Sequence, residues 1–167
     1  MEMNFVVILL TSLVPMVMGF IWYNPKTLGA AWMQAAGVTE EKMKGANMGL
    51  IFGLSFLFSV MLAMAVNGLV IHQNHMYSIL LNEPGFGDPN SELGQYIAAF
   101  MEKYGNNFRT FKHGALHGFL GGLFFAFPIL ATNAMFERKG WKYIWINTGY
   151  WTITLTLMGG ILCAYNR

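Results

Sequence analysis

Four long stretches of the sequence contain no Asp, Glu, Lys or Arg, and they constrain the fold more than any other feature: residues 3–25, 45–82, 113–136 and 143–166. Each contains at least the roughly 20 mostly apolar residues that a helix needs to cross about 30 Å of hydrocarbon. Backbone N–H and C=O groups cannot stay unpaired in lipid, and a barrel strand needs only about 10 residues. These stretches are therefore predicted to be helices.

The prediction for the whole chain is an all-α membrane protein, one domain over residues 1–167, in which four transmembrane helices form a bundle. The predicted spans are residues 5–22, 47–71, 114–135 and 143–164. Charged residues make up 11% of the chain, against about 25% in soluble proteins. The lipid bilayer is therefore the first expected partner.

Two features of the composition exclude other classes. The formal net charge is only +2, and the basic residues flank the apolar runs, so nucleic acid is not an expected partner. Cys163 is the single cysteine, which excludes an internal disulfide and a metal site built from several cysteines.

The first connection is predicted to contain a short helix that lies at the membrane interface. Pro25 suits the first position of a helix with Asn24 as its cap, and Gly37 is placed to end it. Thr39 and the two acids that follow it indicate the next helix start. We expect that helix to continue into the second span.

The long second connection, residues 72–112, is predicted to contain an amphipathic helix. Its apolar residues recur at helical spacing and end at Gly105: Leu93, Tyr96, Ile97, Phe100 and Tyr104. In a membrane protein such a helix typically lies along the interface or caps the bundle.

Basic residues predict the orientation. The first and third connections carry six Lys or Arg residues: Lys26, Lys42, Lys44, Arg138, Lys139 and Lys142. The other side carries four: Lys103, Arg109, Lys112 and Arg167. The positive-inside rule places the first and third connections in the cytoplasm, with both termini and the second connection outside. Four aromatic residues are expected to anchor the cytoplasmic interface: Trp22, Tyr23, Trp32 and Trp141.

Small residues at a spacing of four predict close helix packing in the last two spans. The third span has Gly114, Gly118 and Gly122, and the fourth has Thr148, Thr152, Thr156 and Gly160. A pore lined by these faces is a weaker interpretation, because the thirteen Met and fourteen Phe residues leave little polar lining.

The four histidines form two pairs at one side of the membrane: His72 and His75 after the second span, and His113 and His117 at the start of the third. Spacings of three and four place each pair on one helical face if the helix extends that far. Four converging imidazoles could bind zinc, copper or a haem. The alternative is that they are amphipathic interfacial residues, because no carboxylate or cysteine completes a recognised metal motif. No cofactor is otherwise expected.

Catalytic groups are missing from the sequence pattern. No charged residue lies inside a predicted span, which argues against ion-coupled transport. Ser55 and Ser59 lie in an apolar helix with no histidine near them in sequence. The chain is therefore expected not to be an enzyme.

One motif carries a resemblance to a known family. The pattern Gly19-x-x-Trp22-Tyr23-x-Pro25-x-x-x-Gly29-x-x-Trp32, and Asn147-Thr148-Gly149-Tyr150 near the C-terminus, resemble the bacterial family catalogued as domain of unknown function 1761. The resemblance implies a small multi-spanning protein of the bacterial cytoplasmic membrane, and it carries no activity or site.

Three functions follow as hypotheses. The favoured one is a structural or accessory subunit, or a homo-oligomer, that packs against itself or other membrane subunits. The second is a carrier or channel for a small uncharged or amphipathic molecule. The third is a metal- or haem-binding protein that uses the four histidines.

Overall fold

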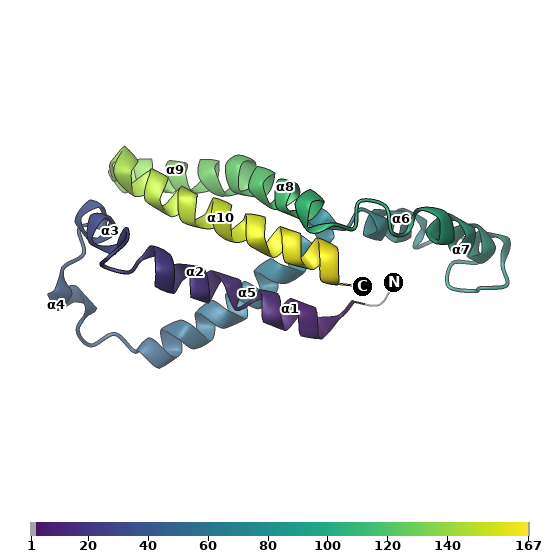
Figure 1. The fold of residues 1–167 in the computed structure, drawn as a ribbon, viewed down its shortest axis with the longest axis horizontal. Coiled ribbons are helices and arrows are strands. Elements are labelled where there is room, and N and C mark those ends of the chain that lie inside the picture. Colours follow the sequence, from purple (N-terminus) through teal and green to yellow (C-terminus); the bar gives the residue numbers. More distant parts are fainter. Residues whose placement is uncertain (1–2, 167) are drawn as a thin grey trace.

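The computed structural model describes residues 3–166, and every regular element within them is helical (Figure 1). The prediction of an all-helical chain is confirmed. The elements are α1 (Phe5–Thr11), α2 (Val14–Trp22), α3 (Gly29–Ala36), α4 (Glu40–Met43), α5 (Met48–Val70), α6 (Gln73–Leu80), α7 (Glu92–Tyr104), α8 (Phe111–Gly121), the π-helical segment η1 (Gly122–Ala126), α9 (Phe127–Phe136) and α10 (Trp141–Tyr165).

Three helical segments among the described residues are long and apolar enough to cross a membrane: Phe5–Trp22, Met48–Val70 and Phe111–Phe136. They agree with the first three predicted spans to within three residues at each end. The fourth predicted span lies in α10, which has 25 residues. Its length is sufficient, but its Asn, Thr and Gly residues lower its mean hydropathy below that of the other three.

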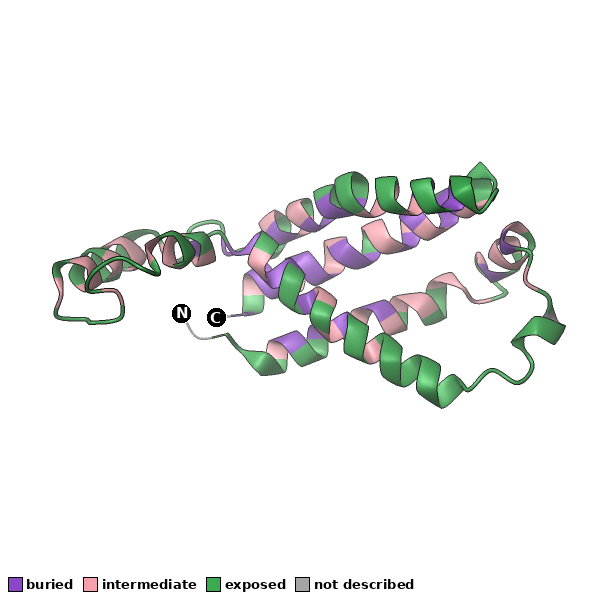
Figure 2. Cartoon of the chain, turned by 180° about the vertical axis from the view of Figure 1, so that it is seen from behind, coloured by how far each residue is buried: buried purple, intermediate pink, exposed green. Residues whose placement is uncertain are grey.

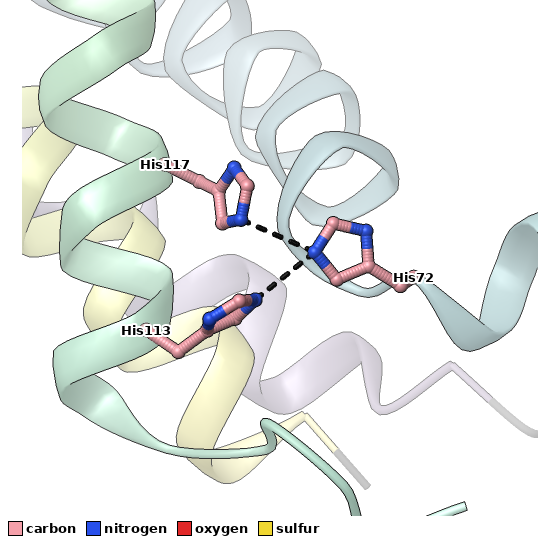
Figure 3. Close-up of side chains that lie close together, drawn as sticks. All are labelled: His72, His113 and His117. Carbon is pink, nitrogen blue, oxygen red and sulfur yellow. Dashed lines mark hydrogen bonds between the residues drawn. The ribbon is translucent and has the colours of Figure 1, made fainter.

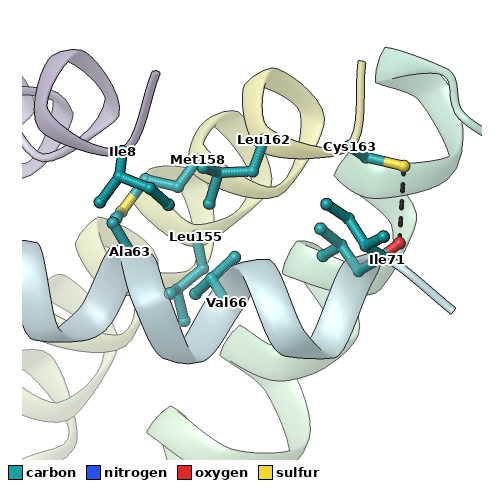
Figure 4. Packing of buried hydrophobic residues seen from close by; sticks show 9 residues of the cluster. Ile8, Ala63, Val66, Ile71, Leu155, Met158, Leu162 and Cys163 are labelled. Carbon is teal, nitrogen blue, oxygen red and sulfur yellow. Dashed lines mark hydrogen bonds between the residues drawn. The ribbon is translucent and has the colours of Figure 1, made fainter. Parts of the chain in front are cut away.

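The helix α10 is the centre of the molecule. It packs against α8, α9, α5, α2 and α1, and the buried residues are concentrated along it (Figure 2). Ile8 of α1, Ala63 of α5 and Met158 of α10 belong to one buried apolar cluster (Figure 4). The polar residues of α10 therefore face other helices to a large extent, which is why a helix with modest hydropathy fits here.

Glycines allow α8 to lie very close to α10. A Cβ atom on Gly114 would overlap the carbonyl group of Gly159, and one on Gly118 would overlap that of Leu155. One on Gly122 would overlap Thr152. Backbone contact at these positions therefore requires glycine.

The other small residues of α10 have different neighbours. Gly160 lies against the ring of Phe111, and the Cα atom of Thr156 lies beside Gly118. The hydroxyl of Thr156 donates to the Thr152 carbonyl oxygen one turn earlier. Thr148 is buried.

Prolines interrupt two of the membrane-length segments. Pro15 stands at the start of α2, after a break at Ser12 and Leu13. Pro128 stands at the start of α9, directly after η1. Proline has no N–H and clashes with the preceding turn, so the regular ladder cannot continue through it. These two membrane-length segments are therefore helical over most of their length, but they are not continuous α-helices.

The first connection differs from the prediction in two places. The helix α3 begins at Gly29 and not at Pro25, because Asn24 caps a local turn by accepting from the Lys26 N–H. Gly37 ends α3 with φ +68°, as predicted. The prediction that the next helix runs into the second span was wrong. The helix α4 is short and ends at Met43, and Gly45 then turns the chain with φ +88°.

The second connection contains α7, as predicted, with Ser91 as its cap and Gly105 at its end. It also contains α6, which the sequence pattern did not predict. Together with both termini, α6 and α7 lie at one end of the molecule, whereas α3, α4 and the α9–α10 turn lie at the other (Figure 1).

Candidate metal centre

The end of α5 determines the position of His72. The helix α5 ends at Val70, and Ile71 takes an extended conformation with ψ 92°. His72 then stands at the N-cap position of α6. The next residue, Gln73, is buried and donates through its side-chain amide to the Asn107 carbonyl oxygen at 2.9 Å.

The other two histidines of the site come from α8. His113 and His117 are one turn apart and therefore lie on one face. Thr110 caps this helix, and its hydroxyl oxygen accepts from the His113 N–H at 3.2 Å. The neighbouring residues Gly114 and Gly118 face α10. The tight α8–α10 contact therefore fixes the direction in which the two imidazoles point.

The three imidazoles meet at one point. Nε2 of His72 lies 3.0 Å from Nε2 of His113 and 3.1 Å from Nε2 of His117 (Figure 3). One potential ligand atom from each ring lies within 4.8 Å of the other two. The described residues contain no other group of three or more His, Cys, Asp or Glu side chains with this property.

Hydrogen bonding alone does not account for this arrangement. An imidazole nitrogen carries either one hydrogen or one lone pair. Nε2 of His72 therefore cannot make a full hydrogen bond to both partners. A metal ion accepts one lone pair from each ring, and tetrahedral geometry with metal–nitrogen distances of about 2.0–2.1 Å holds the nitrogens about 3.3 Å apart. The two separations from His72 are close to that value, and the ligand atoms of His113 and His117 lie within 4.8 Å of each other.

His75 does not join the site. It lies in α6, and its ring centroid is 6.3 Å from that of His72. The prediction placed His72 and His75 on one face of a helix that continues the second span, whereas α5 ends before Ile71 and both residues lie at the start of α6. Three of the four predicted histidines come together.

The surroundings favour the neutral form of His72. Its pKa is lowered from the ordinary value of 6.5, first by partial burial and then by the rings of His117 and His75. A neutral imidazole is the form that binds metals.

The predicted interfacial aromatics lie at the opposite end, and three of them contact α10. The Tyr23 hydroxyl donates to Asn147 Oδ1 at 2.8 Å, and the Trp32 indole donates to the same atom at 3.2 Å. The Trp22 indole donates to the Ile146 carbonyl oxygen at 3.0 Å. We call Trp22, Tyr23, Trp32 and Asn147 the aromatic clamp.

The clamp joins the two sequence motifs on which the family resemblance rests. The Trp22 ring covers Gly149, where a Cβ atom would lie only 3.0 Å from it. The fourth predicted anchor, Trp141, is outside this network and is 60% exposed. The sequence pattern identified the aromatic residues but not their partner.

Sequence reasoning also missed the role of Arg109, which it counted as a loop charge. Its side chain is only 5% exposed. Its guanidinium donates to the carbonyl oxygens of Cys163 and Asn166 at the end of α10. A cation at this position satisfies terminal carbonyls and complements the helix dipole. No local signal distinguishes such an arginine from an exposed one.

The comparisons with known proteins agree with the motif. The family model described as Protein of unknown function (DUF1761) matches residues 6–163, a range that includes the three converging histidines and the whole aromatic clamp. No curated protein and no solved structure matches the chain. The resemblance inferred from the motif is confirmed, and the chain belongs to the DUF1761 family.

Proposed function

We propose that this protein is an integral membrane protein that binds a transition-metal ion through His72, His113 and His117. The observation that carries the proposal is the convergence of three Nε2 nitrogens from two separate segments, with separations of 3.0 and 3.1 Å along two sides. The histidines lie where α5 ends and α8 begins, which is the level of the membrane surface if these helices span the bilayer.

The proposal includes α10 as a fourth span. Its 25 residues extend over about 37 Å at 1.5 Å per residue, which exceeds the hydrocarbon thickness of about 30 Å. Hydrogen bonds from Asn4 to Asn166 and from Trp22 to Ile146 show that it runs antiparallel to α1 and α2 along their length. Close packing with these helices shields its polar side chains from lipid.

The proposed orientation places the metal centre outside the cytoplasm of a bacterial cell, in the inner membrane. It is supported by the six basic residues in the first and third connections, against four elsewhere. The ends of the molecule are consistent with this, because α3, α4 and the α9–α10 turn share one end. The starts of α6 and α8, which carry the three histidines, lie at the other end together with α7 (Figure 1).

The donor set favours zinc or copper over haem. Imidazole suits both metals, and three protein ligands with one free position is a known arrangement for zinc. Haem iron has only two axial positions, on opposite faces of the ring, so three nitrogens that meet at one point do not fit it.

Cobalt binding tests the proposal. Full-length protein purified in detergent and stripped with a chelator is titrated with Co²⁺, and the visible d–d bands are followed. We expect one ion per chain, and a loss of affinity of roughly 100-fold or more in His113→Ala and in His117→Ala. His75→Ala is the matched control and keeps wild-type affinity. Failure of the wild type to bind one Co²⁺, or an equal loss in His75→Ala, contradicts the proposal.

Self-association is a second candidate function, in line with the homo-oligomer hypothesis. The first half of α5, from Met48 to Phe58, is exposed apart from the half-buried Phe56 (Figure 2). It carries Gly49 and Gly53 at the spacing of a membrane dimerisation motif, and a Cβ atom on Gly53 would have no neighbour within 4 Å.

Native mass spectrometry of gently solubilised protein tests this candidate. We expect a dimer that Gly53→Leu converts to monomer, while Met64→Leu on the same helix has no effect. A monomeric wild type argues against it.

A further inference from the structure

An open groove runs beside the metal centre. Its volume is about 380 Å³, and its walls come from α6, α7 and the segment before α8. The apolar wall consists of Met76, Phe100, Tyr104 and Phe108. The amide side chains of Gln73 and Asn107 complete the groove, together with His72.

Two wall residues connect the groove to the centre. His72 is itself one of the three converging histidines. Phe108 packs its ring against that of His113, with 5.1 Å between the centroids.

The backbone holds Phe108 in this place. Its φ is +61°, a left-handed conformation that is uncommon for a residue other than glycine. Its carbonyl oxygen accepts from the Thr110 N–H at 2.8 Å and from the Cys163 thiol at 3.3 Å. Strained residues of this kind concentrate at ligand-binding sites.

The lining indicates the class of ligand. Three aromatic rings and a methionine favour a flat apolar group. No residue that lines the groove carries a charge at neutral pH apart from the titratable His72, so an ionic ligand has no counter-charge there. A three-histidine centre leaves a coordination position for a lone-pair donor.

We infer that the groove binds an uncharged aromatic heterocycle whose ring nitrogen coordinates the metal ion held by His72, His113 and His117. The inference rests on the proposed function, because it requires a bound metal. It adds the site and the chemical class of the molecule that completes the coordination.

A second groove is the competing route to the centre. It has a volume of about 610 Å³, and its walls include His113, Lys112, Leu116 and Phe119. It offers one phenylalanine ring and a lysine, whereas the first offers three aromatic rings and no lysine or arginine. The first groove is therefore the better match for a neutral aromatic ring.

The test compares two probes on the Co²⁺-loaded full-length protein. Imidazole and 4-phenylimidazole are titrated separately at pH 7.5, and the change in the d–d bands gives each Kd. We expect 4-phenylimidazole to bind roughly 10-fold or more tightly than imidazole, because its phenyl ring is buried in the groove.

Two variants locate the phenyl ring. Phe100→Ala in the first groove reduces the preference for 4-phenylimidazole to about 3-fold or less, whereas Leu116→Ala in the second leaves it unchanged. Both variants keep wild-type Co²⁺ affinity, which shows that they are folded. Their comparison also corrects for partition of the probe into detergent, which is the same for both.

The outcomes separate the two proposals. Equal binding of both probes to the loaded wild type overturns the inference and leaves metal binding intact. A preference that Leu116→Ala removes and Phe100→Ala does not also overturns it, because the ligand then uses the second groove. Failure of the wild type to bind Co²⁺ overturns both proposals.

Discussion

The polar groups of the aromatic clamp and those of the histidine site, at opposite ends of the molecule, differ in how they are paired. In the aromatic clamp, Asn147 Oδ1 accepts from Tyr23 and Trp32, and its amide donates to the Tyr143 carbonyl oxygen at 2.8 Å. Donors meet acceptors throughout. At the histidine end, by contrast, the three groups that face one another are all imidazole rings. A network in which every donor is paired with an acceptor indicates a structural role. A cluster that needs a further atom to complete its pairing indicates a ligand site.

Breaking the clamp is expected to have the largest effect. Asn147→Leu leaves the Tyr23 hydroxyl and the Trp32 indole without their acceptor, and each unpaired donor costs about 1–3 kcal/mol. We expect the free energy of unfolding in detergent to fall by about 3 kcal/mol. Co²⁺ affinity should be unchanged, since the clamp lies at the other end. A joint loss of both would mean that the two ends are coupled.

Metal loading is expected to have the next largest effect on the free energy of unfolding, and this effect should depend on the histidines and not on the aromatic clamp. An ion at 100 times its Kd stabilises the folded state by about 2.7 kcal/mol. Thermal unfolding of the stripped protein with and without Zn²⁺ measures this. His117→Ala should lose the stabilisation, and Asn147→Leu should keep it. Equal stabilisation of His117→Ala by Zn²⁺ would show that the ion acts elsewhere.

Single members of the clamp should contribute less. Tyr23→Phe removes one donor while Trp32 still pairs with Asn147, so the expected loss is about 1 kcal/mol. Trp141→Phe, at an exposed aromatic outside the clamp, should change the stability by less than about 0.5 kcal/mol. Denaturation of both variants measures these losses. An equal loss of unfolding free energy in Tyr23→Phe and Trp141→Phe would mean that Tyr23 is a simple interfacial anchor.

The smallest effect concerns pH. The pKa of His72 is lower in the folded chain than its ordinary value of 6.5, so the unfolded chain binds more protons between these two values. Without metal, the free energy of unfolding is therefore highest above pH 6.5, and it falls as the pH drops from 6.5 through the folded pKa. His72→Gln should flatten this part of the profile, and His75→Gln should not. Metal affinity should weaken over the same range, because protons compete for the imidazoles.

Much of the architecture could be predicted because long apolar runs without charged residues are a strong local signal for membrane-length helices. Uncharged runs locate the three apolar spans, and the periodic residues from Leu93 to Tyr104 locate α7. The end of the second span near residue 71 was predicted, but the extended conformation of Ile71 and the restart of the chain as α6 directly after it were not. This turn of the backbone places His72 at the start of α6, where its Nε2 lies within hydrogen-bond distance of both α8 imidazoles.

Contacts between distant segments account for the rest. Tyr23 and Asn147 are 124 residues apart, and nothing near either residue in sequence indicates the other. The aromatic residues were interpreted as lipid anchors because belt positions favour Trp and Tyr. Composition and spacing also placed the four histidines at one side of the membrane, but tertiary packing decides which three of them meet.

The separation of His72 and His113 by 41 positions has a mechanical consequence. An ion shared by these two residues is a reversible cross-link that turns α6, α7 and their connecting turn into a closed ring. Closing a loop removes chain entropy from any opened state, much as a disulfide does. The exposed turn between α6 and α7 would then resist a protease more when the ion is present, so the rate of cleavage there would report metal occupancy.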